Sequence, residues 1–185
     1  MDRKWVRNLK DWPAIEPEFT VWEKYMWDHV DFALTTSVIH TKEHAERVLL
    51  FALLMAHKLG LDKKDREALC HAAIFHDTRR HDDSYDVGHG GRAAVHYKEF
   101  CQEHHLDYDP RTALVMAYHD HPDAEGIAQA KKSGLKNAVL LYQIFKDADG
   151  LDRYRLAPHG LDVKYLRTTV SPSLVPLAKR MNGRV

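Results

Sequence analysis

The chain has 185 residues, of which 44% are hydrophobic and 29% are charged, and its 27 basic and 27 acidic residues give a formal net charge of zero. This composition is typical of a globular domain, and the balanced charge gives no sign of a nucleic-acid or membrane surface. The longest unbroken apolar run, Val48–Ala56, is too short to span a bilayer.

Two further features of the sequence indicate a cytoplasmic protein. Residues 1–10 lack the apolar core of a signal peptide. The two cysteines, Cys70 and Cys101, are too few for a disulfide framework, which favours a reducing compartment.

Apolar residues recur at helical spacing nearly throughout, and no stretch alternates with period two, so we expect an all-α fold. Residues 1–18 contain two prolines and are predicted to form an irregular arm before a helix around residues 19–34. Thr41 is predicted to cap a helix that ends at Gly60, and Asp62 is predicted to cap the next helix, which runs to about residue 75.

The second half of the chain shows further helix signals. An amphipathic helix follows His89, Asp109-Pro110 opens another that stops near Pro122, Gly134 precedes a helical stretch over residues 135–148, and Ser171-Pro172 opens a last short helix. Without repeats or a flexible linker, we expect one domain over residues 1–185. Its parts would be an N-terminal arm and helix (1–39), a core (about 40–154) and C-terminal helices (155–185).

Histidine is unusually frequent, with 14 residues, and it is the commonest metal ligand in proteins. His76 and Asp77 end an apolar helix, while His44 and Asp149 lie on the predicted buried faces of two other helices. An isolated His-Asp pair is more often a satisfied helix end. Three helices that each deliver such a side chain to the interior indicate a divalent metal instead, with Mn, Fe, Ni, Zn and Mg as candidates.

Residues 44–48 (HAERV), 72–77 (AAIFHD) and 148–152 (ADGLD) resemble the H…HD…D signature of the HD superfamily of metal-dependent phosphohydrolases. The resemblance covers about residues 40–154, and residues 146–156 and 162–167 look like the tail of a small bacterial subgroup. It implies an all-α core in which His44, His76, Asp77 and Asp149 bind the metal. Asp147 competes for the last position, and the family pattern favours Asp149.

Some members of this superfamily hold two metal ions, with extra histidines at places similar to His89 and His119. The competing interpretation of His89 is a polar residue in a glycine turn. For His119 it is an imidazole favoured by the helix dipole, and His121 is an alternative to His119 as a ligand. The site is therefore expected to hold one or two ions.

The resemblance implies hydrolysis of a phosphate ester or anhydride, usually of a nucleotide, by water that a metal ion activates. Asp77 is a candidate general base as well as a ligand. Arg80 is the preferred partner for the substrate phosphate, with Lys146 and Arg153 as further candidates. The alternative for Arg80 is a solvated side chain or one paired with neighbouring aspartates.

Two other functions remain open. An HD-type diiron oxygenase would require iron and both His89 and His119 as ligands. A non-catalytic HD module would bind a ligand or partner, and amphipathic terminal helices leave an oligomer possible. His40, which precedes the predicted cap, is given no ligand role.

Overall fold

The computed structural model describes residues 6–183, and the regular elements within this range are all helices, which confirms the predicted all-α class. Residues 1–5 and 184–185 lie outside this range. Residues 1–5 are the start of both the expected arm and the segment that lacks the apolar core of a signal peptide. Within the described range no helix combines the length and apolarity that a membrane crossing would need.

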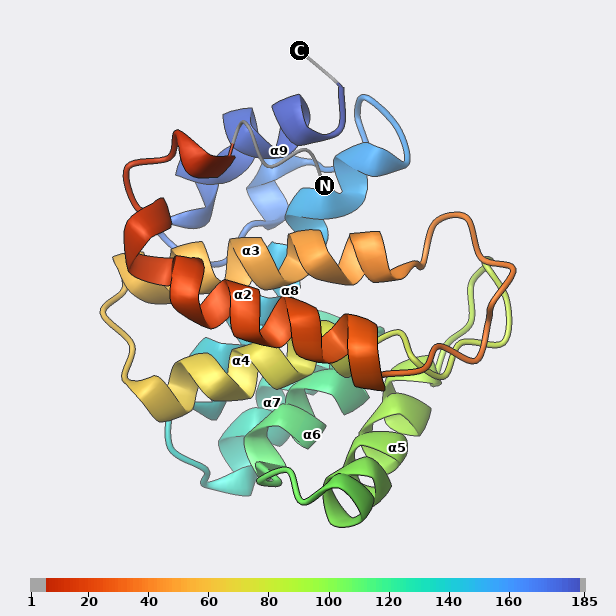
Figure 1. Ribbon diagram of the computed structural model, residues 1–185. Coiled ribbons are helices and arrows are strands. Elements are labelled where there is room, and N and C mark those ends of the chain that lie inside the picture. Colours follow the sequence, from red (N-terminus) through yellow and green to blue (C-terminus); the bar gives the residue numbers. More distant parts are fainter. Residues whose placement is uncertain (1–5, 184–185) are drawn as a thin grey trace.

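The helices follow one another along the chain as shown in Figure 1. Their bounds are α2 Trp12–His29, α3 Lys42–Lys58, α4 Lys63–Phe75, α5 His89–His104, α6 Pro110–Tyr118, α7 Asp123–Ser133, α8 Ala138–Asp152 and α9 Val175–Met181, with short 3-10 helices η1 Arg153–Arg155, η2 Val163–Tyr165 and η3 Ser171–Leu174.

Three predicted caps are confirmed by their hydrogen bonds. The Thr41 hydroxyl accepts from the backbone N–H of His44, and the Asp62 and Asp109 carboxylates accept from backbone N–H groups in the first turns of α4 and α6. Each bond satisfies a donor that the helix itself leaves unpaired. The first cap matters most for the site, because it fixes the turn of α3 that carries His44.

The prediction of an irregular arm over residues 1–18 is wrong from residue 12 onward, where α2 begins. Pro13 occupies the first turn, in which a missing N–H costs nothing, and Pro17 is tolerated inside the helix. The buried side chains of α2, among them Ile15, Phe19 and Met26, compensate for the hydrogen bond that Pro17 cannot make.

Other boundaries also differ from expectation. The predicted helix over residues 19–34 ends at His29, and α8 spans 138–152 rather than 135–148, so Asp149 lies inside this helix. Helix α7 was not predicted. Residues 156–170, expected to be helical, contain one short 3-10 helix and otherwise lack regular structure.

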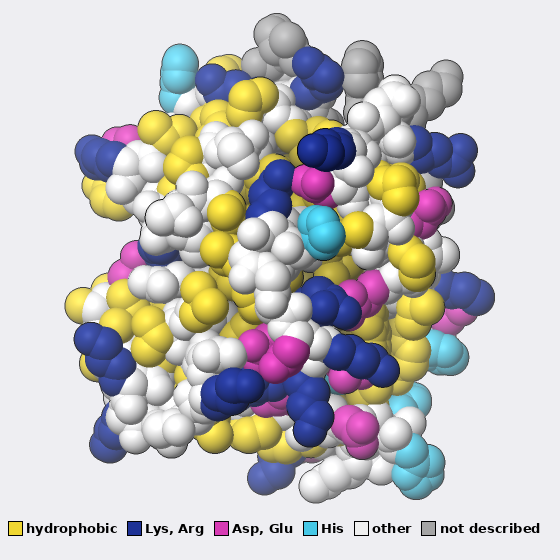
Figure 2. All heavy atoms as spheres, turned by 90° about the vertical axis from the view of Figure 1, so that its left-hand side faces the viewer, with side chains coloured by type: hydrophobic (Ala, Val, Ile, Leu, Met, Phe, Trp, Pro, Cys, Tyr) yellow, Lys and Arg dark blue, Asp and Glu magenta, His cyan; other side chains and the backbone are white. Residues whose placement is uncertain are grey.

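Helix α3 lies at the centre of the fold and packs against α2, α4 and α8, with α5, α6 and α7 gathered on the far side of α4 (Figure 1). The whole apolar run Val48–Ala56 is buried, which explains why it lacks the polar face of an ordinary surface helix. Cys70 and Cys101 are free and buried. On the face shown in Figure 2, basic and acidic side chains are interspersed with hydrophobic ones, in keeping with the balanced charge.

Acid conditions are expected to destabilise the fold through His71 of α4, which is 1% exposed. Its Nδ1 lies 2.8 Å from the Tyr97 hydroxyl, and its Nε2 has no hydrogen-bond partner among the described residues. Burial lowers the pKa of His71 to about 4. Because the unfolded chain binds this proton near pH 6.5, stability due to neutral His71 is present above pH 6.5 and is lost as the pH falls towards 4.

We therefore expect wild type to lose about 2–3 kcal/mol more unfolding free energy than His71→Gln between pH 7 and pH 4.5, measured by urea denaturation. The control is His57→Gln, which changes an exposed histidine at the end of α3 and should follow wild type. Parallel pH curves for wild type and His71→Gln would contradict the prediction.

Candidate metal centre

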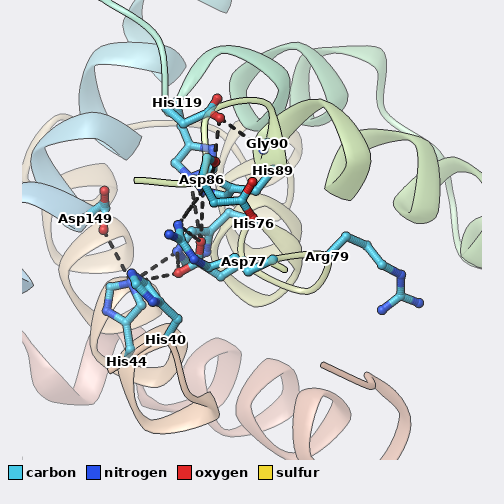
Figure 3. Close-up of polar contacts among 12 residues, drawn as sticks. His40, His44, His76, Asp77, Arg79, Asp86, His89, Gly90, His119 and Asp149 are labelled. Atoms are coloured by element: carbon cyan, nitrogen blue, oxygen red, sulfur yellow. Dashed lines mark hydrogen bonds and ion pairs between the residues drawn. The ribbon is translucent and has the colours of Figure 1, made fainter. Parts of the chain in front are cut away.

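Six side chains from five parts of the chain converge beside α3 (Figure 3). His44 comes from the first turn of α3, His76 and Asp77 follow α4 directly, His89 begins α5, His119 follows α6, and Asp149 lies in the last turn of α8. Five of the six are at most 5% exposed, whereas the Asp149 side chain is 29% exposed and faces a cleft. These are the six metal ligands that the sequence predicted, and the structure brings all of them together.

The first group of ligands consists of His44, His76 and Asp77. The Nε2 atoms of the two histidines are 3.2 Å apart, and Asp77 Oδ2 lies 3.5 Å from His44 Nε2 and 3.3 Å from His76 Nε2. Asp149 Oδ1 approaches the same His44 nitrogen at 3.3 Å. His44, His76 and Asp77 therefore present two imidazole nitrogens and one carboxylate oxygen to one point, and Asp149 approaches it from the side of His44.

The second group consists of Asp77, His89 and His119. The Nε2 atoms of His89 and His119 are 2.9 Å apart. Asp77 Oδ1 lies 3.1 Å from His89 Nε2 and 3.9 Å from His119 Nε2. Asp77 thus turns one oxygen to each group. A carboxylate in this position can bridge two cations.

In each of the four histidines, the contact made by Nδ1 leaves Nε2 as the ring nitrogen that faces the cluster. Each Nδ1 lies against an oxygen, in the pairs His44 with Asp152 (2.7 Å), His76 with Ala73 O (2.9 Å), His89 with Asp86 O (2.6 Å) and His119 with Met116 O (2.7 Å). A backbone carbonyl can only accept, so Nδ1 carries the proton and Nε2 presents its lone pair. Two such lone pairs 2.9 or 3.2 Å apart repel each other unless a proton or a metal ion lies between them. The Arg80 guanidinium, 3.1 Å from His89 Nε2, relieves this repulsion only in the second group. The buried donor set therefore fits a metal ion.

Asp152 is a part of this site that the sequence analysis missed. Its carboxylate is fully buried and accepts from His44 Nδ1 and, at 2.6 and 3.0 Å, from the Arg47 guanidinium. Burial alone would raise the pKa of Asp152, but these two partners hold it below its usual value. The charged carboxylate fixes the His44 ring and increases its basicity as a ligand. No sequence signal links two residues 108 positions apart.

The cluster also perturbs its own members. Burial alone would raise the pKa of Asp77, but the neighbouring His76, His89 and His44 hold it well below its usual range. Burial, together with His89 and His76, lowers the pKa of His119 to about 3. The favoured state around Asp77 is therefore an ionised carboxylate beside a neutral His119, which is the ligand form of both groups.

Asp147 and Asp149 take different positions. Asp147 is fully buried on the side of α8 away from the cluster, where it accepts from Thr168 N at 2.7 Å and from Ser171 Oγ at 2.8 Å, besides Arg167. Two residues along a helix are about 200° apart, so only one of the pair can face His44. That residue is Asp149.

The predicted cations line the same cleft but are partly engaged. Arg80 is 6% exposed, with one guanidinium nitrogen 3.6 Å from Asp77 Oδ1 and another bonded to Ser84 O at 2.7 Å. Lys146 Nζ donates to the carbonyl of His119 at 2.6 Å, so it holds the end of α6. Arg153 Nε donates to Gly160 O at 2.8 Å.

The cleft above the ligands has a volume of about 750 Å³. Its walls come from the segments before α3 and after α4, from the end of α8 and from the irregular segment that follows it. This size matches pockets that take up small organic ligands. Four of the six ligand-type side chains, Asp77, His89, His119 and Asp149, line this cleft. A metal ion held by Asp77 in either group would therefore be accessible to a molecule bound in the cleft.

Comparisons with protein-family models, with curated proteins and with solved structures gave no significant match to this chain. The structure itself defines the class, an all-helical protein with a buried histidine and aspartate cluster. The side chains of His44, His76, Asp77, His89 and His119 in this cluster can hold a metal ion.

Proposed function

We propose that this protein is a metal-dependent phosphohydrolase of the HD type that acts on a nucleotide or another small phosphate ester or anhydride. The observation that carries the proposal is the position of Asp77, whose two oxygens serve two imidazole groups at the base of a cleft. The H…HD…D spacing supports it independently, because the resemblance rests on the sequence alone. A cytoplasmic location is part of the same proposal.

His44, His76, Asp77 and Asp149 would hold one divalent ion, and Asp77, His89 and His119 a second. When bound, such ions supply hydroxide near neutral pH and polarise phosphoryl oxygens. Four imidazoles and two carboxylates suit Mn, Fe, Ni or Zn better than Mg, which prefers oxygen ligands.

The chain's own residues have distinct tasks in this proposal. Arg80 places a guanidinium beside Asp77, where it can bind a phosphate oxygen once the negative substrate arrives. Both Asp77 oxygens face imidazoles, so we assign it the bridging role and not that of a general base. Arg153, on the cleft wall, is available for the remainder of the substrate.

The test combines metal analysis with hydrolysis assays. Protein purified without chelator should contain about two metal ions per chain, His119→Ala about one, and His76→Ala at most one. Wild type should release phosphate from nucleotides with Mn or Ni present, and chelation should abolish the release. Protein that takes up no metal under any condition would exclude the proposal.

A diiron oxygenase is a second candidate, because His89 and His119 both join the cluster and complete a six-ligand set. The measurement that separates the two candidates is metal identity together with oxygen consumption. Two irons per chain, oxygen uptake with a reduced organic substrate and no phosphate release would favour the oxygenase.

A further inference from the structure

The two groups of candidate ligands differ in the charges beside them. A second carboxylate approaches the first group, because Asp149 Oδ1 lies 3.3 Å from His44 Nε2. A cation approaches the second group, because one terminal guanidinium nitrogen of Arg80 lies 3.6 Å from Asp77 Oδ1 and 3.1 Å from His89 Nε2. These are the two atoms that Asp77 and His89 turn towards each other, 3.1 Å apart. The positive charge of Arg80 therefore lies beside the atoms that would bind the second metal ion.

The segment after α4 holds the Arg80 side chain in this position. Its Nε donates to the carbonyl of Asp82 at 3.2 Å, and its second terminal nitrogen donates to the carbonyl of Ser84 at 2.7 Å. Arg80 is buried, so solvent and salt screen its permanent charge only weakly. Among residues 6–183, Asp77 is the one carboxylate within ion-pair distance of Arg80, and it is also the carboxylate shared by both groups.

Arg80 and a cation in the second group therefore compete for the same two ligand atoms. Their positive charges repel each other, and the repulsion is strong where burial lowers the dielectric constant. A phosphate group in the cleft would relieve it, because a guanidinium binds phosphate through two charge-assisted hydrogen bonds and Arg80 lines that cleft.

We infer that Arg80 controls the second metal group. Its guanidinium weakens binding of the second ion until a phosphate group in the cleft pairs with it, so the substrate itself helps to recruit that ion. This inference rests on the proposed phosphohydrolase function. It concerns affinity, and it agrees with two ions per chain when the metal is abundant.

The coupling between phosphate and the second ion is reciprocal. If phosphate raises the affinity of this ion by some factor, the ion raises the affinity of phosphate by the same factor. The first ion should respond less, because in the described part of the chain Arg80 forms no hydrogen bond or ion pair with His44, His76 or Asp149.

The competing explanation is that phosphate strengthens metal binding only as a ligand, without any role for Arg80. The two explanations differ for protein without phosphate. If Arg80 repels the second ion, Arg80→Gln should bind this ion more tightly even then, whereas the competing explanation predicts no change. Glutamine removes the charge but keeps an amide that can donate to the carbonyls of Asp82 and Ser84.

The experiment titrates the full chain with Mn²⁺ in the presence and absence of inorganic phosphate. Electron paramagnetic resonance counts the bound ions, since the signal of free Mn²⁺ disappears on binding. For wild type we expect phosphate to strengthen binding of the second ion at least about tenfold and to affect the first ion less. Without phosphate, Arg80→Gln should bind the second ion at least about tenfold more tightly than wild type, and added phosphate should change this little. Arg80→Lys keeps the charge and should stay closer to wild type.

Arg79→Gln is the matched control, because it makes the same change one residue earlier on a side chain that points away from the cluster (Figure 3). The Arg79 guanidinium donates to the carbonyl of Asp31 at 3.1 Å and lies 2.8 Å from His96 Nδ1. This variant should bind both ions as wild type does. Circular dichroism checks the fold of each variant, and Arg80→Met repeats the removal of charge if Arg80→Gln does not fold.

Tighter binding of the second ion in Arg80→Gln alone, before phosphate is added, would support the inference. Unchanged or weaker binding in that variant, equal strengthening in Arg79→Gln, or no effect of phosphate on wild type would overturn it while the phosphohydrolase proposal stands. Wild type that takes up no Mn²⁺ would overturn both.

Discussion

Asp77→Ala is expected to abolish binding of both metal ions, whereas loss of any other single ligand should affect mainly one. Asp77 alone contributes an oxygen to each group, at 3.3 Å from His76 Nε2 and 3.1 Å from His89 Nε2. Its removal also takes away the carboxylate that lies between the two pairs of imidazoles. Because bound metal supplies several kcal/mol of transition-state stabilisation, hydrolysis should fall at least about 10³-fold.

Metal content by mass spectrometry and phosphate release are the two measurements. Asp162→Ala provides the control, because this exposed aspartate lies on the rim of the same cleft and contacts Lys164 instead of the ligands. It should retain two ions and nearly full activity. Retention of one tightly bound ion by Asp77→Ala would show that this carboxylate does not bridge.

Asp147→Ala and Asp149→Ala are expected to have opposite effects. Loss of the Asp147 carboxylate leaves the buried Thr168 N–H without its acceptor, takes one of two acceptors from the Ser171 hydroxyl and removes an ion pair with Arg167. We expect a loss of about 2–4 kcal/mol in the free energy of unfolding, with metal binding preserved. Asp149→Ala should instead lose an ion and activity, with little change in the stability of the metal-free chain.

Denaturant unfolding in the presence of chelator, paired with metal titration of the folded proteins, measures both effects. The two variants serve as controls for each other, since they remove the same group two residues apart on one helix. If Asp147→Ala lost metal and Asp149→Ala lost stability, the assignment of the fourth ligand to Asp149 would be reversed.

Binding of a metal ion at the cluster is also expected to raise the free energy of unfolding. The metal-free cluster contains buried carboxylates and facing lone pairs that favour opening of the fold. An ion that binds only the folded chain stabilises it by about 2.7 kcal/mol at a concentration 100 times its Kd. The candidate ligand side chains thus lower the stability of the metal-free fold, and a bound ion is expected to restore it.

The sequence alone determined those features that depend on local interactions. Thr41, Asp62 and Asp109 predicted helix starts because a capping side chain acts within three residues of its own position. Helical periodicity likewise placed His44 and His76 on buried faces, and the order of ligand types along the chain indicated a metal. The choice of His89 and His119 came from the resemblance, and the structure places both at the cluster.

Contacts between distant parts of the chain decided the rest. Helix α2 begins at Trp12 because burial of its apolar face outweighs the prolines, a gain that depends on α3 and α4. The partners of Asp152 and His40 come from segments 108 and 43 residues away, and local pattern carries no information about such pairs. Periodicity gives the direction of a side chain from its own helix axis. Which atom it meets there depends on how the helices pack, and packing is set by the whole core.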